Sequence, residues 1–180
     1  MKKEIFQEIE IPYGVEVVIN GSEIIINGKE GENKRSFKLR KIKLEKKDNK
    51  IIVGQKNATK NEKKIINTTV AHIKNMIKGV QKKFKYNLKV CFSHFPISVK
   101  MEGRNIIVKN FLGEKIDRKT TVPEGVEVEV DKEFITITST NKEKAGEAAA
   151  NFERVTKIKN RDRRIFQDGI FITSKTGREI

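Results

Sequence analysis

The chain has 180 residues, of which 36% are hydrophobic and 35% charged, so we expect one or two domains with lean cores. A formal net charge of +15 and a pI near 9.8 indicate a polyanionic partner, either nucleic acid or an anionic membrane face. The absence of a membrane-spanning apolar run, of a secretory signal at the N-terminus and of any cysteine besides Cys91 favours a cytoplasmic protein without disulfides or a four-cysteine zinc site.

Alternating strand patterns dominate the first half of the chain. Residues 15–19 and 23–26 flank Asn20-Gly21, which favours a tight hairpin because both residues tolerate positive φ. The basic alternating stretch 37–44 is predicted as a further strand, and a turn at Asp48-Asn49 leads into a strand at 51–53. A helical stripe then runs from Ile65 to Val80, with Thr59 and Glu62 as a capping box and Gly79 as the stop.

The second half repeats this order of elements. Strands are predicted at residues 98–101 and 106–108, on either side of a turn at Gly103, and again at 126–130 and 134–138. A second helix follows, with an apolar stripe from Ala145 to Ile158 and a capping-box candidate formed by Thr140 and Glu143.

A shift of 82 residues superimposes the two halves. It places Gly21 on Gly103, the triplet 24–26 on 106–108, and Val70 on Phe152. We therefore predict an α+β protein of two tandem homologous domains, residues 1–81 and 82–180, each an antiparallel sheet with one long helix packed on one face. The segment 81–86 between the halves is either a linker or a strand of the second domain.

The two halves carry different cations. Residues 1–90 hold 22 Lys and Arg against 10 Asp and Glu, whereas residues 91–180 hold 17 against 14. Yet only Arg35 and Arg40 lie in the first half, and the other seven arginines lie in the second. Because the arginine fork matches phosphate oxygens and lysine acts as a hydrated point charge, we expect diffuse attraction from the first half and shaped contacts from the second.

Residues suited to catalysis or metal binding are sparse. Cys91 and His94 have ligand-like spacing but supply two of the four ligands of structural zinc, with His72 as a distant third candidate. Glu127 and Glu129 alternate outward on a strand and are expected to be functionally inert. The string Gly28-Lys29-Glu30-Gly31 follows a strand instead of joining two helices, so it is not a KH-type loop. No metal, cofactor or catalytic site is predicted.

Two stretches favour nucleic-acid binding. Residues 154–164 contain six cations and one carboxylate at the end of the second helix, where one or two cations would satisfy the helix dipole. Residues 110–115, Asn-Phe-Leu-Gly-Glu-Lys, form a glycine-containing loop between strands, followed closely by Arg118 and Lys119.

The Asn110–Lys115 string resembles the hallmark of the large-subunit ribosomal protein six family in its archaeal and eukaryotic form. The strings 94–97 (His-Phe-Pro-Ile) and 166–170 (Phe-Gln-Asp-Gly-Ile), the Ile11-Pro12 opening and the duplication also resemble that family. The resemblance implies a non-catalytic structural constituent of the large ribosomal subunit, a monomer within the ribosome among neighbouring large-subunit proteins. It implies that the second domain is the main anchor to large-subunit rRNA, near the region where translation factors dock.

The same resemblance, together with the basic stretches, selects the candidate rRNA contacts. From the loop and the strand after it, from the basic end and from the C-terminal tail these are, in order, Asn110, Lys115, Arg118, Lys119, Lys157, Lys159, Arg161, Arg163, Arg164 and Lys175.

Two alternatives stay open at this point. An RNA-binding assembly factor or RNA-processing enzyme outside the mature ribosome would need a metal or acid–base site. A peripheral membrane protein would need a basic amphipathic helix with a free apolar face, but the apolar stripe within residues 62–80 is assigned to the sheet, so no membrane partner is expected.

Overall fold

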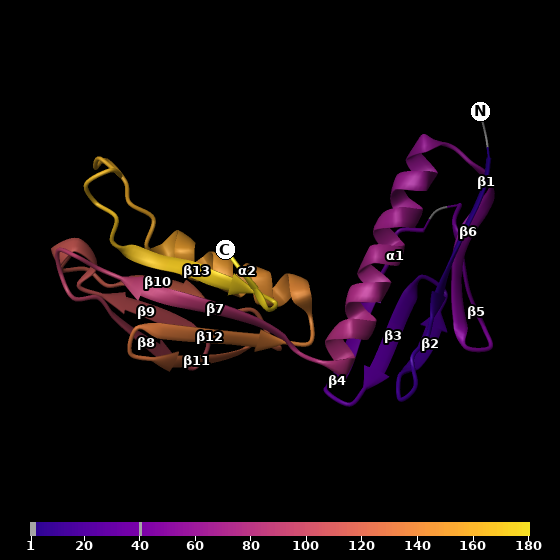
Figure 1. Ribbon diagram of the computed structural model, residues 1–180, viewed down its shortest axis with the longest axis horizontal. Helices are drawn as coiled ribbons and strands as arrows, with labels where there is room; N and C mark the ends of the chain where they lie inside the picture. The colour runs from indigo at the N-terminus through magenta and orange to yellow at the C-terminus, as the bar shows by residue number, and fades with distance from the viewer. Residues whose placement is uncertain (1–2, 40) are drawn as a thin grey trace. The chain divides into compact units, whose positions relative to one another are not determined.

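The computed structural model describes residues 3–39 and 41–180, and the chain forms two compact units, residues 1–83 and 84–180 (Figure 1). Met1, Lys2 and Arg40, from which the N-terminal start and part of the basic stretch 37–44 were predicted, lie outside the described residues. Neither of the α-helices in the described residues is long and apolar enough to cross a bilayer.

Unit 1 consists of two antiparallel three-stranded sheets and one long helix. The sheets have the orders β1-β6-β5 and β2-β3-β4. The elements are β1 Lys3–Glu10, β2 Glu16–Asn20, β3 Glu23–Gly28, β4 Gly31–Ser36, β5 Lys43–Lys47, β6 Lys50–Ala58 and α1 Lys60–Gln81. Helix α1 packs against strands of both sheets, so one helix closes the core of the unit.

The spacing of the apolar residues along the strands and along the helix explains why α1 packs against the sheets. Ile24 and Ile26 point inward from β3, and Ile66 and Ile73 recur on one side of α1; all four are 0% exposed. Burying each of these side chains stabilises the unit by about 2 kcal/mol. The predicted capping box is confirmed, because Thr59 is the N-cap and its backbone N–H donates to Glu62 at 2.9 Å.

Helix α1 continues to Gln81, so the prediction that Gly79 ends it was wrong. Val80 is fully buried, and its carbonyl accepts a hydrogen bond from the backbone N–H of Glu30 at 2.9 Å. Gly28 makes this approach possible, because a Cβ there would lie 2.8 Å from Val80 Cγ2. Packing against the β3–β4 turn therefore holds the last helical turn in place.

The basic stretch 37–44 is not a continuous strand, contrary to the prediction. Phe37 and Ile42 are buried, but a turn between them is closed by a hydrogen bond from the Ile42 N–H to the Leu39 carbonyl at 2.8 Å. The chain must pass here from the β2-β3-β4 sheet to the other sheet, and β5 starts only at Lys43. The alternation arises because buried apolar residues, Phe37 and Ile42, lie on either side of the turn that connects the two sheets.

Unit 2 contains a three-stranded sheet, β10-β9-β8, a five-stranded sheet, β11-β12-β7-β13-β14, and one α-helix in its described residues. The elements are β7 Phe84–Cys91, β8 Ser98–Glu102, β9 Asn105–Lys109, the 3-10 turn η1 Phe111–Gly113, β10 Arg118–Thr121, β11 Glu127–Asp131, β12 Phe134–Ser139, α2 Lys142–Val155, β13 Gly169–Lys175 and β14 Arg178–Glu179. The sequence left segment 81–86 as either a linker or a strand; its first residue ends α1, and residues 84–86 begin β7. Strand β7 is the central strand of its sheet.

The topology repeats between the units, in agreement with the α+β prediction of two similar halves. The order β1-β6-β5 recurs as β7-β12-β11, and β2-β3-β4 recurs as β8-β9-β10, although each half has two sheets where one was predicted. Gly21 and Gly103 both sit in hairpin turns with φ of 62° and 61°. Strands β13 and β14 have no counterpart in unit 1.

Helix α2 differs at both ends from the prediction. Its N-cap is Asn141, whose side-chain oxygen accepts hydrogen bonds from the backbone N–H groups of Glu143 and Lys144, in place of the predicted Thr140 box. The helix ends at Val155, so Ile158 lies beyond it. Most of the basic stretch 154–164 is consequently loop rather than helix, with only its first two residues in α2.

Candidate nucleic-acid interface

Two loops of unit 2 carry most of the predicted contacts. The Asn110 loop, residues 110–117, joins β9 to β10, and the basic loop, residues 156–168, joins α2 to β13. Both extend from the same end of the unit, where the basic loop projects beyond the secondary structure (Figure 1). A small number of side chains connects the two loops.

The Asn110 loop is tightly folded. Asn110 and Gly113 have φ of 57° and 76°, a region that asparagine and glycine occupy more readily than other residues. Phe111 and Leu112 are buried in the core, and the Asn110 side-chain amide donates to the Pro96 carbonyl at 3.0 Å. Asn110 is thus exposed but already bound to its own chain, and Lys115 is directed to the surface without a recorded partner.

Arg118 joins the Asn110 loop to the end of α2. Its Nε and Nη2 donate to the two carboxylate oxygens of Glu114 at 2.7 and 2.6 Å. Its Nη1 donates to the carbonyls of Val155 at 2.9 Å and Lys157 at 3.1 Å. The guanidinium carbon also lies 4.2 Å from the centre of the Phe111 ring.

These contacts hold the Arg118 side chain between the Asn110 loop and the end of α2. Its side chain is 23% exposed, and its three guanidinium nitrogens make four hydrogen bonds to protein oxygens. The hydrogen bonds from Arg118 hold the pKa of Glu114 below its usual range, so the Glu114 carboxylate stays ionised at neutral pH. Sequence reasoning found the residue but assigned it the role of an outward contact.

The basic loop presents its cations in different ways. Lys157, Lys159 and Arg163 are exposed, and Arg163 lines a cavity of about 770 Å³ beneath the loop. Arg161 lies over the ring of Phe166, 4.9 Å from its centre. Arg164 is paired with Asp162 at 2.9 Å, and this pair stabilises the turn at the tip of the loop.

A buried carboxylate anchors the base of the basic loop, and sequence reasoning missed it. Asp168 is 1% exposed and accepts hydrogen bonds from Ser93 Oγ at 2.9 Å, His94 Nδ1 at 2.9 Å and the His94 backbone N–H at 3.1 Å. Burial opposes ionisation of Asp168, but the bonds from His94 and Ser93 outweigh it and lower its pKa to about 2.

The same anchor organises a stack of rings. The His94 ring lies against Phe166 at a centroid distance of 4.8 Å, and Arg161 covers Phe166 as well. The strings at 94–97 and 166–170 were each singled out in the sequence, but nothing in either string indicated that they meet. Only the pairing of β13 with β7, which places Gly169 opposite Cys91, brings them together.

The two remaining candidate rRNA contacts, Lys119 and Lys175, lie in different parts of unit 2. Lys119 is exposed on β10, one residue after Arg118, and its side chain leaves the opposite face of the strand. Lys175 lies at the far end of β13, about 20 Å from Gly169 at the usual strand rise. The structure therefore does not bring Lys175 together with the other candidates.

The metal candidates do not converge. Cys91 is a free, partly exposed cysteine, and His94 Nδ1 is bound to Asp168. His72 belongs to α1 in the other unit. Among the described residues no group of three or more His, Cys, Asp or Glu side chains is arranged to hold a metal ion.

Comparisons with known proteins agree with this architecture. The model of a family described as ribosomal protein L6 matches residues 11–83 and 95–169, one segment in each unit. Three similar proteins are each named large ribosomal subunit protein uL6.

That of Methanobrevibacter smithii is 43% identical over 169 residues, covering 94% of this chain and 95% of the relative. That of Methanococcus vannielii is 43% identical over 172 residues, covering 96% and 94%. That of Staphylothermus marinus is 46% identical over 172 residues, covering 93% of each. The chain therefore belongs to the ribosomal protein L6 family, which confirms the resemblance found in residues 94–97, 110–115 and 166–170.

Proposed function

We propose that the chain, as a structural ribosomal protein and not an enzyme, binds large-subunit rRNA through one end of unit 2. The proposed surface, called the unit 2 basic surface, consists of Lys115, Lys119, Lys157, Lys159, Arg161 and Arg163. The observation that carries the proposal is the set of hydrogen bonds made by Arg118, called the Arg118 clamp, which joins the two loops that bear all of these cations except Lys119. Residues far apart in the sequence thereby form one cationic surface.

Recognition at this surface combines charge with shape. Lysine and arginine side chains displace condensed counterions from phosphates, which drives binding and makes it depend on salt. The Asp168 anchor and the Arg118 clamp hold the loop backbones before RNA arrives, so less conformational entropy is lost on binding. Folded RNA is read largely through phosphates, 2′-hydroxyls and grooves, and this requires few exposed aromatic residues.

We assign the main rRNA anchor to unit 2 because of where its cations lie, although the N-terminal half of the chain has the larger net positive charge. The N-terminal half carries the larger excess of cations, but most of them are lysines. In unit 2 five cations lie on the basic loop, which the Arg118 clamp and the Asp168 anchor hold in place, and Arg161 is pre-oriented by Phe166. The proposed setting is the large subunit of cytoplasmic ribosomes, with the chain as a monomer beside other large-subunit proteins and near the region where translation factors dock.

Replacing Lys157, Lys159 and Arg163 together with alanine is expected to weaken binding to large-subunit rRNA by about tenfold at physiological salt. The slope of log affinity against log salt concentration should fall by about 2 to 3, because three phosphate contacts are lost. No hydrogen bond of these three side chains is recorded in the structure, so thermal unfolding should not change. Filter binding over a salt series measures both quantities.

The matched control is a triple variant in unit 1, Lys29, Lys34 and Lys43 to alanine, which removes the same charge from exposed strand and turn positions. A loss of affinity equal to that of the control would show that only net charge matters, and the unit 2 basic surface would then be rejected as the anchor.

A further inference from the structure

A cationic groove lies in unit 1, the unit that does not carry the surface proposed above. It runs between the end of β4 and the first half of α1 and has a volume of about 550 Å³. Its lining includes three cations, Arg35, Lys38 and Lys64, and two hydroxyl side chains, Ser36 and Thr68. None of the described residues that line it is acidic. We call it the β4–α1 groove.

On the helix side the charge of this groove is not balanced by its neighbours along the chain, whereas on the strand side Glu23 stands opposite Ser36. No Asp or Glu occurs between Lys63 and Met101. Glu62, at the start of α1, accepts hydrogen bonds from Thr59 in the capping box, and these lower its pKa. Lys38 and Lys64 are exposed, and no carboxylate occurs among the residues that line the groove.

The floor of the groove positions the arginine. The Arg35 guanidinium lies over the ring of the buried Phe37, 5.5 Å from its centre. The rings of Phe37 and His72 are 6.2 Å apart, so strand and helix meet at this point. An arginine supported by an aromatic ring loses less freedom on binding a phosphate than an unsupported one.

The corresponding junction in unit 2 is bridged by a side chain. Asn151, which the 82-residue shift places at Thr69, donates its side-chain amide to the Thr121 carbonyl at 3.0 Å and so bridges α2 to the end of β10. Thr69 in unit 1 has no side-chain amide with which to make the same bridge.

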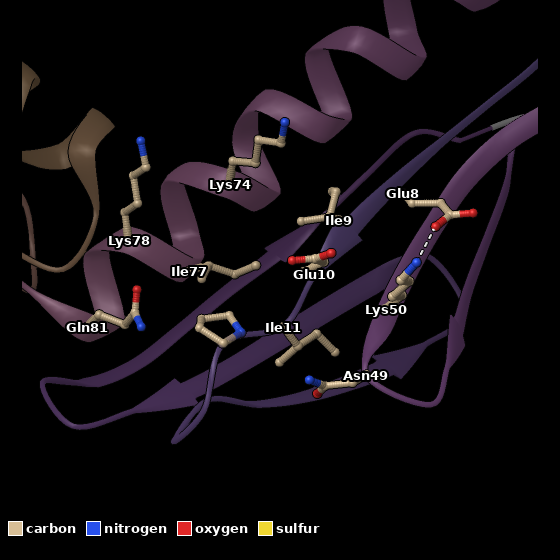
Figure 2. Close-up of a pocket in the computed structure, with 11 residues that line it drawn as sticks. Glu8, Ile9, Glu10, Ile11, Asn49, Lys50, Lys74, Ile77, Lys78 and Gln81 are labelled. Atoms are coloured by element: carbon tan, nitrogen blue, oxygen red, sulfur yellow. Dashed lines mark hydrogen bonds and ion pairs between the residues drawn. The ribbon is translucent and has the colours of Figure 1, made fainter.

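A second groove on α1 provides an internal comparison. It is lined by Lys74 and Lys78 from the helix, but Glu8 and Glu10 line it as well, and Glu8 pairs with Lys50 at 2.8 Å (Figure 2). Its charges are mixed, so it lacks the uniform sign that attracts a polyanion.

We propose that the β4–α1 groove binds the sugar–phosphate backbone of an RNA segment separate from the one bound by the unit 2 basic surface. Lysine, arginine and serine or threonine side chains are the groups that commonly contact phosphate and sugar oxygens. A groove with such groups and no acidic lining matches that chemistry, and it gives a role to three of the cations that unit 1 carries.

The first test replaces Lys38 and Lys64 with alanine in the full chain. Affinity for large-subunit rRNA should fall by about three- to tenfold and the salt slope by about 1.5 to 2, as expected for two phosphate contacts. The control replaces Lys74 and Lys78, which removes the same charge from the same helix and should have little effect. Equal effects of the two double variants, or no effect of either, would overturn the proposal.

The second test locates the RNA. A Ser36→Cys variant in a Cys91→Ser background carries a tethered iron chelate that cleaves nearby RNA by hydroxyl radicals, and a Lys159→Cys variant reports on unit 2. Cleavage from position 36 at rRNA sites distinct from those of position 159 supports the groove. No rRNA cleavage from position 36, or crosslinking of that cysteine to a protein alone, contradicts it.

The two proposals fail separately in these experiments. If the triple variant of unit 2 loses affinity while the Lys38/Lys64 variant does not, only the groove is rejected. If the reverse is found, the main anchor has been assigned to the wrong unit while the groove stands.

Discussion

Replacing Arg118 with lysine is expected to lower the affinity for large-subunit rRNA by about tenfold, although the net charge of the protein does not change. Lysine keeps the positive charge but cannot donate to both oxygens of Glu114 while also reaching the carbonyls of Val155 and Lys157. The Asn110 loop and the end of α2 should then move independently. Filter binding at fixed salt measures the loss, and hydrogen exchange of residues 110–117 should become faster.

Arg118→Ala should have a larger effect on stability. It removes the ion pair, two hydrogen bonds to backbone carbonyls and the contact with Phe111, and should lower the free energy of unfolding of unit 2 by about 3 kcal/mol. For a unit of this size the thermal midpoint would fall by roughly 15 °C.

The control for the lysine variant is Arg104→Lys. Arg104 also pairs with a carboxylate of unit 2, Glu124, but its side chain is 60% exposed and the pair lies away from both loops. Little change is expected there in either affinity or stability. Full affinity of Arg118→Lys would show that the two loops do not need to be joined for binding.

Replacing Asp168 with asparagine is expected to destabilise unit 2 by about 2 to 3 kcal/mol. The carboxylate accepts from Ser93 and from two N–H groups of His94, and an amide of the same size has one oxygen to accept with and an NH₂ group that faces donors. The stack of His94, Phe166 and Arg161 should loosen with it, so RNA affinity should fall as well.

The Asp168 anchor also predicts how stability depends on pH. Its pKa in the folded protein is about 2, below the value of 3.8 for the free group. The folded state therefore binds this proton less readily than the unfolded state, and the stabilising effect is complete above about pH 4. It declines as the pH falls from about 4 to 2 and the carboxylate becomes protonated.

Urea unfolding of unit 2 between pH 5 and pH 2 tests this. The wild type should lose more stability across that range than Asp168→Asn, because the variant has no carboxyl to titrate at this position. Asp131→Asn, at an exposed position ending β11, is the matched control and should follow the wild type. Parallel curves for wild type and Asp168→Asn would contradict the role given to the anchor.

The duplicated pattern of the two units could be read from the sequence because it depends on local rules. The hairpin at Gly21 repeats at Gly103, since both turns need positive φ, and the helical stripes through Ile73 and Phe152 follow the period of 3.6. Where local rules compete with tertiary contacts, prediction failed. Gly79 does not end α1, because Val80 is held by Gly28 and Glu30 of the opposite turn.

The candidate rRNA-binding site could be predicted from the sequence only in part. The composition of residues 154–164 and the Asn110–Lys115 string indicated which segments carry cations, because charge and turn chemistry are properties of short stretches. The sequence did not indicate which of these cations are exposed and which are held by contacts within the chain. Arg161, Arg163 and Arg164 are close neighbours in the chain, yet one stacks on a ring, one lines a cavity and one pairs with Asp162.

The sequence by itself thus determined the fold class, the duplication, the family and the two basic segments, all of which depend on periodicity, composition or contiguous motifs. Tertiary structure alone decided that Arg118 joins those segments, that Asp168 holds His94 across 74 positions of the chain, and that the groove beside α1 is open and uniformly cationic. The physical reason is that such contacts are made between residues brought together by strand pairing and helix docking, and their geometry has no local signature in the chain.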